Sequence, residues 1–186
     1  MTRRARTRLD VENFSLKSFT QSEARVLAPA KKEVLELLEA KGDVFSRQHF
    51  LPGHLTASAF LIDPASRSLF LILHKKLNLW LQPGGHVEAE DDDMLAAATR
   101  ELIEETGAKD AKARAGLFDI DVHEIPAHGL EPGHRHYDLR YAFDVASISP
   151  RLTDEVKDAR FFSFEFLALH SDDASMKRVA QRLLSQ

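Results

Sequence analysis

Three glutamates, Glu101, Glu104 and Glu105, stand within one short stretch of helix-forming composition. Residues three and four apart are neighbours on a helix surface, so these carboxylates share one region, where like charges repel. A hard divalent cation such as Mg²⁺ takes oxygen ligands, would offset the repulsion and would bridge the carboxylates to phosphates. A solvated acidic face is the alternative for these glutamates taken alone. The residue types therefore allow metal-dependent phosphate chemistry without requiring it.

The neighbours of these glutamates favour the metal site. Gly84 and Gly85 let the backbone turn sharply and approach a ligand closely, which leaves a carbonyl oxygen as a further ligand. Arg100 precedes Glu101 and can fix its carboxylate by a bidentate contact. The 186-residue chain has no cysteine, so a metal must be held by carboxylates, histidines or carbonyl oxygens.

The elements that position these residues follow from the apolar pattern. Segment 93–106 is expected to be a helix, with Leu95, Ala98 and Leu102 on one apolar face and Gly107 as its stop. Before it, a hairpin is expected because two β-rich runs flank a turn of Asp and Pro. The expected strands are 54–63, 68–76, 78–85, 115–125, 136–145 and 159–164, and a closing helix is expected at 174–185. This order predicts an α/β fold of mixed α+β type, with helices packed on a mixed β-sheet.

The N-terminal region is expected to be an addition to one domain. Four arginines lie near the start of the chain: Arg3, Arg4, Arg6 and Arg8. A solvated, disordered tail is favoured over a nucleic-acid-binding arm, because no aromatic residue is interleaved and the chain is acidic overall. Segment 22–42 is expected to be an amphipathic helix with a break near Pro29. We expect a basic tail and helical extension over 1–48 and a single domain over 49–186.

Composition sets broad limits. The chain is 44% hydrophobic with a net charge of -4, which is ordinary globular composition. No apolar run is long enough to span a bilayer, and the basic start is not followed by the apolar core of a signal peptide. A cytoplasmic protein is expected, without a membrane or nucleic-acid partner. The N-terminal helix is expected either to cap the sheet or to form a homodimer contact.

The glutamates and glycines belong to one longer motif. The segment 84–108, GGHVEAEDDDMLAAATRELIEETGA, resembles the Nudix box, and its second half from Arg100 to Ala108 matches the family pattern at every specified position. The first half departs from it, since eight residues separate Asp91 from Arg100 where the pattern has seven. Either Asp91 or Asp92 then takes the place of the pattern's glutamate. Capping of the helix is favoured over metal binding for Asp91, Asp92 and Asp93. The resemblance extends over roughly residues 50–170.

The resemblance implies a Nudix-like α/β/α sandwich that hydrolyses a nucleoside diphosphate linked to another group, with Mg²⁺ or Mn²⁺. It implies Glu101 and Glu105 as principal metal ligands, Glu104 as a third ligand or water-holding group, the Gly85 carbonyl as a further ligand, and Arg100 as the group that orients Glu101. The general base is placed first at Glu155, which could equally complete the metal shell. A surface charge is the alternative for Glu155, and Glu124 and Glu131 are the next candidates for the base.

A second region, 123–136, is rich in histidine. His123, His128, His134 and His136 fall in or beside one loop, and two histidines one residue apart on a strand point the same way. Substrate contact and structural hydrogen bonding are ranked equally, and a zinc site is ranked last because no ligand set with acidic support stands out. His86 is expected to be a loop hydrogen-bonder that can also contact substrate. Tyr137 and Arg140 are further candidates for substrate contact, against core packing and a solvated surface charge respectively.

Two functions stay open at this point. A metal-dependent pyrophosphohydrolase is favoured by the intact glutamates and Arg100. The alternative is a non-catalytic Nudix-like domain that binds a nucleotide metabolite as a sensor. The choice among nucleoside diphosphate derivatives rests on pocket loops that one sequence does not define.

Overall fold

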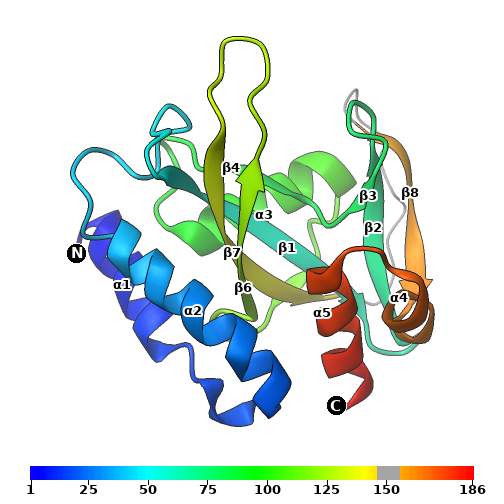
Figure 1. Cartoon of the computed structure of the whole chain (residues 1–186). Helices are drawn as coiled ribbons and strands as arrows, with labels where there is room; N and C mark the ends of the chain where they lie inside the picture. Colours follow the sequence, from blue (N-terminus) through cyan, green and yellow to red (C-terminus); the bar gives the residue numbers. More distant parts are fainter. Residues whose placement is uncertain (146–155) are drawn as a thin grey trace. The chain divides into compact units, whose positions relative to one another are not determined.

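A computed structural model describes residues 1–145 and 156–186, and Figure 1 shows the whole chain. Its helices are α1 (Arg3–Asn13), α2 (Gln21–Leu37), α3 (Met94–Thr106), α4 (Phe164–His170) and α5 (Ala174–Leu184), with a short 3₁₀ turn at Leu16–Ser18. Its strands are β1 (Gly53–Asp63), β2 (Ser68–His74), β3 (Trp80–Leu81), β4 (Gly84–His86), β5 (Lys112–Ala113), β6 (Asp119–Ile125), β7 (His134–Asp144) and β8 (Val156–Ser163). The eight strands make up one sheet, which confirms the mixed α+β class.

The chain divides into two compact units. Unit 1 is Met1–Ser58, Gly84–Ala98 and Ala115–Tyr141, and unit 2 is Ala59–Pro83, Thr99–Arg114 and Ala142–Gln186. Strands β1 and β7 and helix α3 contribute residues to both units. Within the described residues, no helix is both long and apolar enough to cross a bilayer.

Unit 1 contains the N-terminal helices and two antiparallel strand pairs. Strand β4 pairs with β1, and β6 pairs with β7 in a hairpin whose long loop projects at the top of Figure 1. Helix α2 begins at a capping box, in which the Thr20 hydroxyl accepts from the Glu23 amide and the Glu23 carboxylate accepts from the Thr20 amide. Its buried apolar residues recur at helical spacing: Leu27, Ala30, Val34 and Leu37.

Two N-terminal predictions are wrong. Residues 3–13 are helix α1 rather than a disordered tail. Helix α2 continues through Pro29 instead of breaking there. Pro29 is exposed, so water can solvate the carbonyl whose partner amide a proline lacks. The domain boundary at residue 48 stays a prediction.

Unit 2 is built around the expected hairpin. Strand β1 pairs with β2 through Leu61 opposite Phe70, and the Asp63 carboxylate accepts from amides of the connecting turn. Strand β2 also pairs with β3 and with β8, so it has strand partners along both of its edges. Helices α4 and α5 each begin at a capping side chain, Ser163 and Asp173. The predicted strand at 159–164 and the closing helix are confirmed. Helix α4 lies between them and agrees with the short helix that the family resemblance implies after the aromatic strand.

Helix α3 matches its predicted bounds closely. Asp93 caps it, because its carboxylate accepts from the Ala96 amide at 2.9 Å. Ala98 and Leu102 are buried as expected, while Leu95 is half-buried. Gly107 follows the last turn with a φ of +74°, the left-handed conformation that ends many helices.

Candidate functional site

The glutamates of α3 are held by Arg100. Its Nη1 atom donates to Glu101 Oε1 at 2.9 Å and to Glu104 Oε2 at 3.3 Å. The Glu101 side chain is 15% exposed and that of Glu104 is 59% exposed, so the contact with Glu101 is the better shielded from solvent. Glu105 is half-buried one residue beyond Glu104. The expected contact between Arg100 and Glu101 is therefore present.

The glutamates of α3 offer the donor type that a hard divalent ion takes, and their role as its ligands stays a prediction. Glu101, Glu104 and Glu105 supply carboxylate oxygens from neighbouring positions of one helix, and oxygen ligands are what Mg²⁺ and Mn²⁺ prefer. Gly85 lies in unit 1, in strand β4, where it pairs with Ala57. Its carbonyl as a further ligand stays a prediction. Glu155 lies outside the described residues, and its role as base stays a prediction too.

The two glycines before the helix form a strand, not the expected sharp turn. A Cβ atom on Gly84 would lie 2.4 Å from Ser58 Oγ and 2.8 Å from the Ala57 carbonyl oxygen. Glycine is therefore needed here for close approach of β4 to β1, a packing reason rather than a conformational one.

Hydrogen bonds from its own aspartates and from helix α1 stabilise the loop between β4 and α3. Asp91 is buried, and its carboxylate accepts from the Glu88 amide at 2.8 Å. Arg3 donates to the Ala89 carbonyl oxygen at 2.8 Å, and Arg6 donates to that of Asp92 at 2.7 Å. Capping is confirmed for Asp93. Asp91 instead stabilises the loop through its carboxylate, and Asp92 does so through its backbone carbonyl.

One face of the strands in unit 1 is polar and buried. Side chains alternate along a strand, so every second residue shares a face. In the β6–β7 register, Asp119 lies opposite Arg140, Asp121 opposite Asp138, and His123 opposite His136. Strand β1 adds His54, Thr56 and Ser58 at the same two-residue spacing, and β4 adds His86 opposite Thr56. His134 precedes His136 by two residues on β7 and shares the face. Seven polar residues of this face are at most 6% exposed: His54, Thr56, Ser58, Asp119, His134, Asp138 and Arg140.

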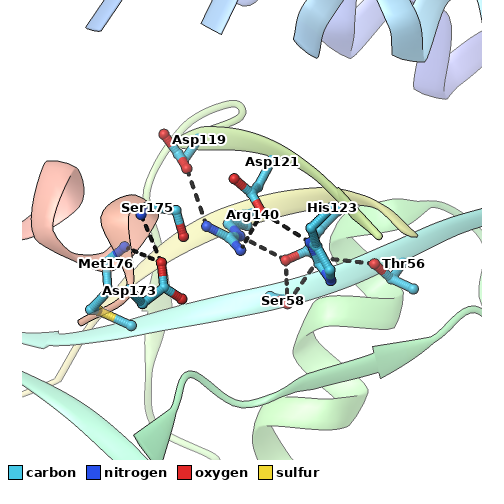
Figure 2. A network of polar contacts seen from close by, with 10 residues as sticks. Thr56, Ser58, Asp119, Asp121, His123, Arg140, Asp173, Ser175 and Met176 are labelled. Carbon is cyan, nitrogen blue, oxygen red and sulfur yellow. Dashed lines mark hydrogen bonds and ion pairs between the residues drawn. The ribbon is translucent and has the colours of Figure 1, made fainter. Parts of the chain in front are cut away.

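Arg140 is the centre of a buried ion-pair network on this face (Figure 2). It is 3% exposed, and it donates to Asp138 at 2.7 Å, Asp121 at 3.2 Å and Asp119 at 3.5 Å. Asp138 also accepts from the hydroxyls of Thr56 and Ser58. The three carboxylates raise the pKa of Arg140 against the lowering effect of burial. Arg140 is thus not a solvated surface charge, and a contact with substrate stays a prediction.

The histidines form a separate group on the same face. The ligand atoms of His54, His86 and His136 all lie within 4.8 Å of one another. The rings of His54 and His136 have centroids 4.7 Å apart, and those of His54 and His86 are 5.1 Å apart. The Nε2 atoms of His134 and His136 are 3.2 Å apart, which confirms that these two histidines point the same way.

Burial lowers the pKa of His54, His86 and His136. Burial first, then the neighbouring His86 and His134, lowers the pKa of His54 to about 4. Burial first, then His54, His86, His123 and His134, lowers the pKa of His136 to about 2. Burial and the nearby Arg47 lower the pKa of His86. His54 is the member that the sequence interpretation missed, and its signal was the alternation of His54, Thr56 and Ser58 in an otherwise apolar strand.

The remaining candidates have separate surroundings. Tyr137 is 3% exposed, with the Arg135 guanidinium 5.4 Å from its ring centroid. His123 Nδ1 lies 2.9 Å from Asp121 Oδ2. His128 stands in the β6–β7 loop, in an isolated bridge with Glu131. The structure does not bring His128 into the group of His54, His86 and His136.

Comparison with known proteins gives the family. The model of the NUDIX domain matches residues 52–183. The structure of the E. coli dihydroneopterin triphosphate pyrophosphohydrolase aligns with a TM-score of 0.59 at 15% identity, covering 71% of this chain and 96% of that one. The MutT protein from Methanosarcina mazei Go1 aligns with a TM-score of 0.52 at 16% identity, covering 70% and 92%. A NUDIX-family hydrolase from Clostridium perfringens aligns with a TM-score of 0.50 at 23% identity, covering 71% and 96%.

No curated protein matches this chain in sequence. At these identities the structural likenesses show the fold alone, whereas the family model covers well over half of the chain. The chain belongs to the NUDIX domain family.

Proposed function

We propose that this chain hydrolyses a pyrophosphate bond in a nucleoside diphosphate linked to another group, with Mg²⁺ or Mn²⁺ as cofactor. Family membership makes the chain an enzyme that acts on phosphorus anhydrides, and the substrate class and the metal are the proposed part. The observation that supports the proposal most is the contact of Arg100 with Glu101 and Glu104 on the helix of the box.

In this proposal Glu101, Glu104 and Glu105 hold the metal, with the Gly85 carbonyl as a predicted further ligand. The bound metal supplies charge neutralisation on the phosphate oxygens. Arg100 holds the Glu101 carboxylate in one orientation, because its guanidinium donates to Glu101 Oε1. Glu155 is proposed to take the proton from the attacking water.

Family membership supports phosphate chemistry but does not define the substrate of this chain. The E. coli protein acts, by its name, on dihydroneopterin triphosphate, but 15% identity carries no substrate over to this chain. Contact of substrate with His86, His134, His136, Tyr137 or Arg140 stays a prediction, as do the cytoplasmic location and the homodimer.

The test is phosphate release from a panel of nucleoside diphosphate derivatives with Mg²⁺, Mn²⁺ or chelator, read with a coupled phosphatase. Wild-type protein should cleave one compound class only with metal, and Glu105→Gln should be inactive while still folded. Glu36→Gln is the matched control, because Glu36 is an exposed helical glutamate paired only at the surface with Lys32 at 3.5 Å. Activity of Glu105→Gln at the wild-type level would remove the metal assignment.

Glu155→Gln separates the base from a binding role. We expect a lower kcat with little change in KM. If only KM rises, the base must be sought at Glu124 or Glu131, whose side chains are 76% and 53% exposed. If the whole panel is silent but nucleotides still raise the melting temperature, the sensor function replaces the hydrolase.

A further inference from the structure

Strands β1, β4 and β7 bring three imidazoles together in unit 1, where His54 is buried and His86 and His136 are half-buried. We propose that His54, His86 and His136 form a binding site for a transition-metal ion, with Zn²⁺ as the best-fitting ion. The site is chemically different from the carboxylates of α3, because it offers nitrogen rather than oxygen ligands. It does not depend on the proposed hydrolysis.

The distances are close to those of a nitrogen-ligated metal. Zinc binds imidazole nitrogen at about 2.0–2.1 Å in tetrahedral geometry, which places two ligand atoms about 3.3 Å apart. The ligand atoms of the three histidines are already within 4.8 Å of one another. Closing the remaining gap needs side-chain rotations and small shifts, not a rearrangement of the strands.

His54 gives an independent reason for a ligand. The residue is 1% exposed, and apart from a weak contact with the backbone of His49 neither ring nitrogen makes a hydrogen bond among the described residues. A buried polar group whose hydrogen bonds are incomplete destabilises a fold and calls for a specific explanation. A metal ion bound at one nitrogen would satisfy the imidazole that the protein pairs poorly.

His134 extends the group and has a defined tautomer. Its Nδ1 lies 2.9 Å from the Pro132 carbonyl oxygen, which can only accept, so Nδ1 carries the proton. Its Nε2 then presents a lone pair toward His136 Nε2, 3.2 Å away. A backbone carbonyl that fixes the far nitrogen is typical of metal-binding histidines. His134 therefore stands next to the site as its fourth imidazole.

The backbone around His54 is built for close packing. A Cβ atom on Gly53 would lie 2.0 Å from the Arg135 carbonyl oxygen, so only glycine allows β1 to approach β7 here. His54 follows Gly53, and His136 follows Arg135, so the contact between the two backbones sets the two histidines against each other. Rigid strands are the elements on which a metal site holds its geometry best.

The alternative, that these histidines contact substrate phosphates, fits less well. A phosphate is large and needs donors that surround its oxygens, whereas His54 is 1% exposed and the ligand atoms of the three imidazoles lie within 4.8 Å of one another. That separation is one that a single metal ion can bridge. The geometry thus favours a cation as the occupant.

The experiment is metal binding by the full chain. Protein stripped with chelator is titrated with Co²⁺ and Zn²⁺ in millimolar Mg²⁺, which fills oxygen sites but does not compete for nitrogen ligands. Binding is read from the visible absorption of nitrogen-bound Co²⁺, and bound zinc is counted by mass spectrometry after gel filtration. We expect about one zinc ion per chain and displacement of Co²⁺ by Zn²⁺.

His136→Gln and His86→Gln should each weaken Zn²⁺ binding by more than about 100-fold, because loss even of an outer-shell partner weakens binding about 10–100-fold. His170→Ala is the control, since His170 is exposed at the end of α4, and its affinity should equal that of wild type. Glu105→Gln should also keep the Co²⁺ spectrum, which separates this site from the proposed hydrolase. Absence of binding in wild type, or unchanged affinity in folded His136→Gln, would overturn the proposal. Circular dichroism checks that each variant is folded.

Discussion

Replacing Arg140 by methionine tests the buried ion-pair network directly. Methionine keeps an unbranched side chain but removes the guanidinium, so Asp138, Asp121 and Asp119 lose the cation that they share. Asp138 is 2% exposed and Asp119 is fully buried, so water cannot readily replace the lost contacts.

The magnitude follows from the contacts. Two of the three, at 2.7 Å and 3.2 Å, are within good hydrogen-bond distance, and the third, at 3.5 Å, is at its limit. A hydrogen bond to a charged group contributes about 1.5–3 kcal/mol, so the two good contacts amount to about 3–6 kcal/mol. Loss of one partner from a buried ion pair destabilises by about 3–5 kcal/mol. We therefore expect the free energy of unfolding to fall by about 4 kcal/mol.

A second arginine supplies the matched control. Arg114 contacts both carboxylate oxygens of Asp144, at distances between 2.7 Å and 3.1 Å. These side chains are 31% and 39% exposed, so the geometry is as good as that of Arg140 while the burial is much less. Arg114→Met should lower the free energy of unfolding by only about 0.2–1 kcal/mol. Both variants are measured by urea unfolding followed by circular dichroism.

Two results would refute this reasoning. One is a loss below about 1 kcal/mol in Arg140→Met, which would be the size expected of a surface pair. The other is equal losses in Arg140→Met and Arg114→Met, since burial would then make no difference. Adding Asp138→Asn to Arg140→Met removes one buried charge that has lost its partner. The double variant should therefore regain part of the stability, because the effects of mutations at contacting residues are not additive.

Three further predictions concern single positions. Gly53→Ala should lower the free energy of unfolding by about 3 kcal/mol or more, because the new Cβ would overlap the Arg135 carbonyl, and urea unfolding measures this loss. Tyr141→Phe should be as stable as wild type or more stable by up to about 1 kcal/mol at pH 7, since the buried hydroxyl has no hydrogen-bond partner among the described residues. Burial raises the pKa of Tyr141 above its ordinary 10.0, so wild type should lose stability as pH rises past 10, and Tyr141→Phe should lose less in unfolding series at each pH. Arg100→Ala should lower kcat/KM about 10- to 100-fold through loss of the Glu101 contact, measured on the substrate found in the panel.

Each of these predictions can fail. Gly129→Ala is the control for Gly53→Ala, because Gly129 has a φ of +61° but open space around it, and equal losses would show that overlap is not the cause. If Tyr141→Phe lost as much stability above pH 10 as wild type does, the raised pKa of Tyr141 would be contradicted. Unaltered kcat/KM in Arg100→Ala would show that Glu101 needs no fixed orientation.

Local patterns were enough to predict most of the fold. The hairpins β1–β2 and β6–β7, helix α3 and helix α5 follow from alternation, helical spacing and turn residues, which act over a few neighbouring positions. Helix α1 was missed because its arginines bind carbonyl oxygens far along the chain, such as that of Ala89, and these partners cannot be read locally. The break expected at Pro29 ignored the rest of α2, whose capping box and buried face hold the helix together.

The site was predicted only in part, for a related reason. Glu101 and Arg100 are adjacent in sequence, so their contact follows from helix geometry and from the family motif. His54 and His136 are far apart in sequence, and their contact depends on which strands pair. The two-residue spacing of polar side chains in β1 and β7 is a usable signal, but the apolar residues between them are equally typical of a core strand.

The arginines of α1 tie the start of the chain to the loop before α3. Arg3 and Arg6 occupy carbonyl oxygens in that loop, at Ala89 and Asp92, where the one-residue insertion relative to the family pattern lies. A longer loop has more conformations to lose on folding, and two guanidinium contacts offset part of that entropy. The added helix therefore works as a brace for the irregular half of the motif, and removal of the first dozen residues should loosen a segment more than eighty positions away.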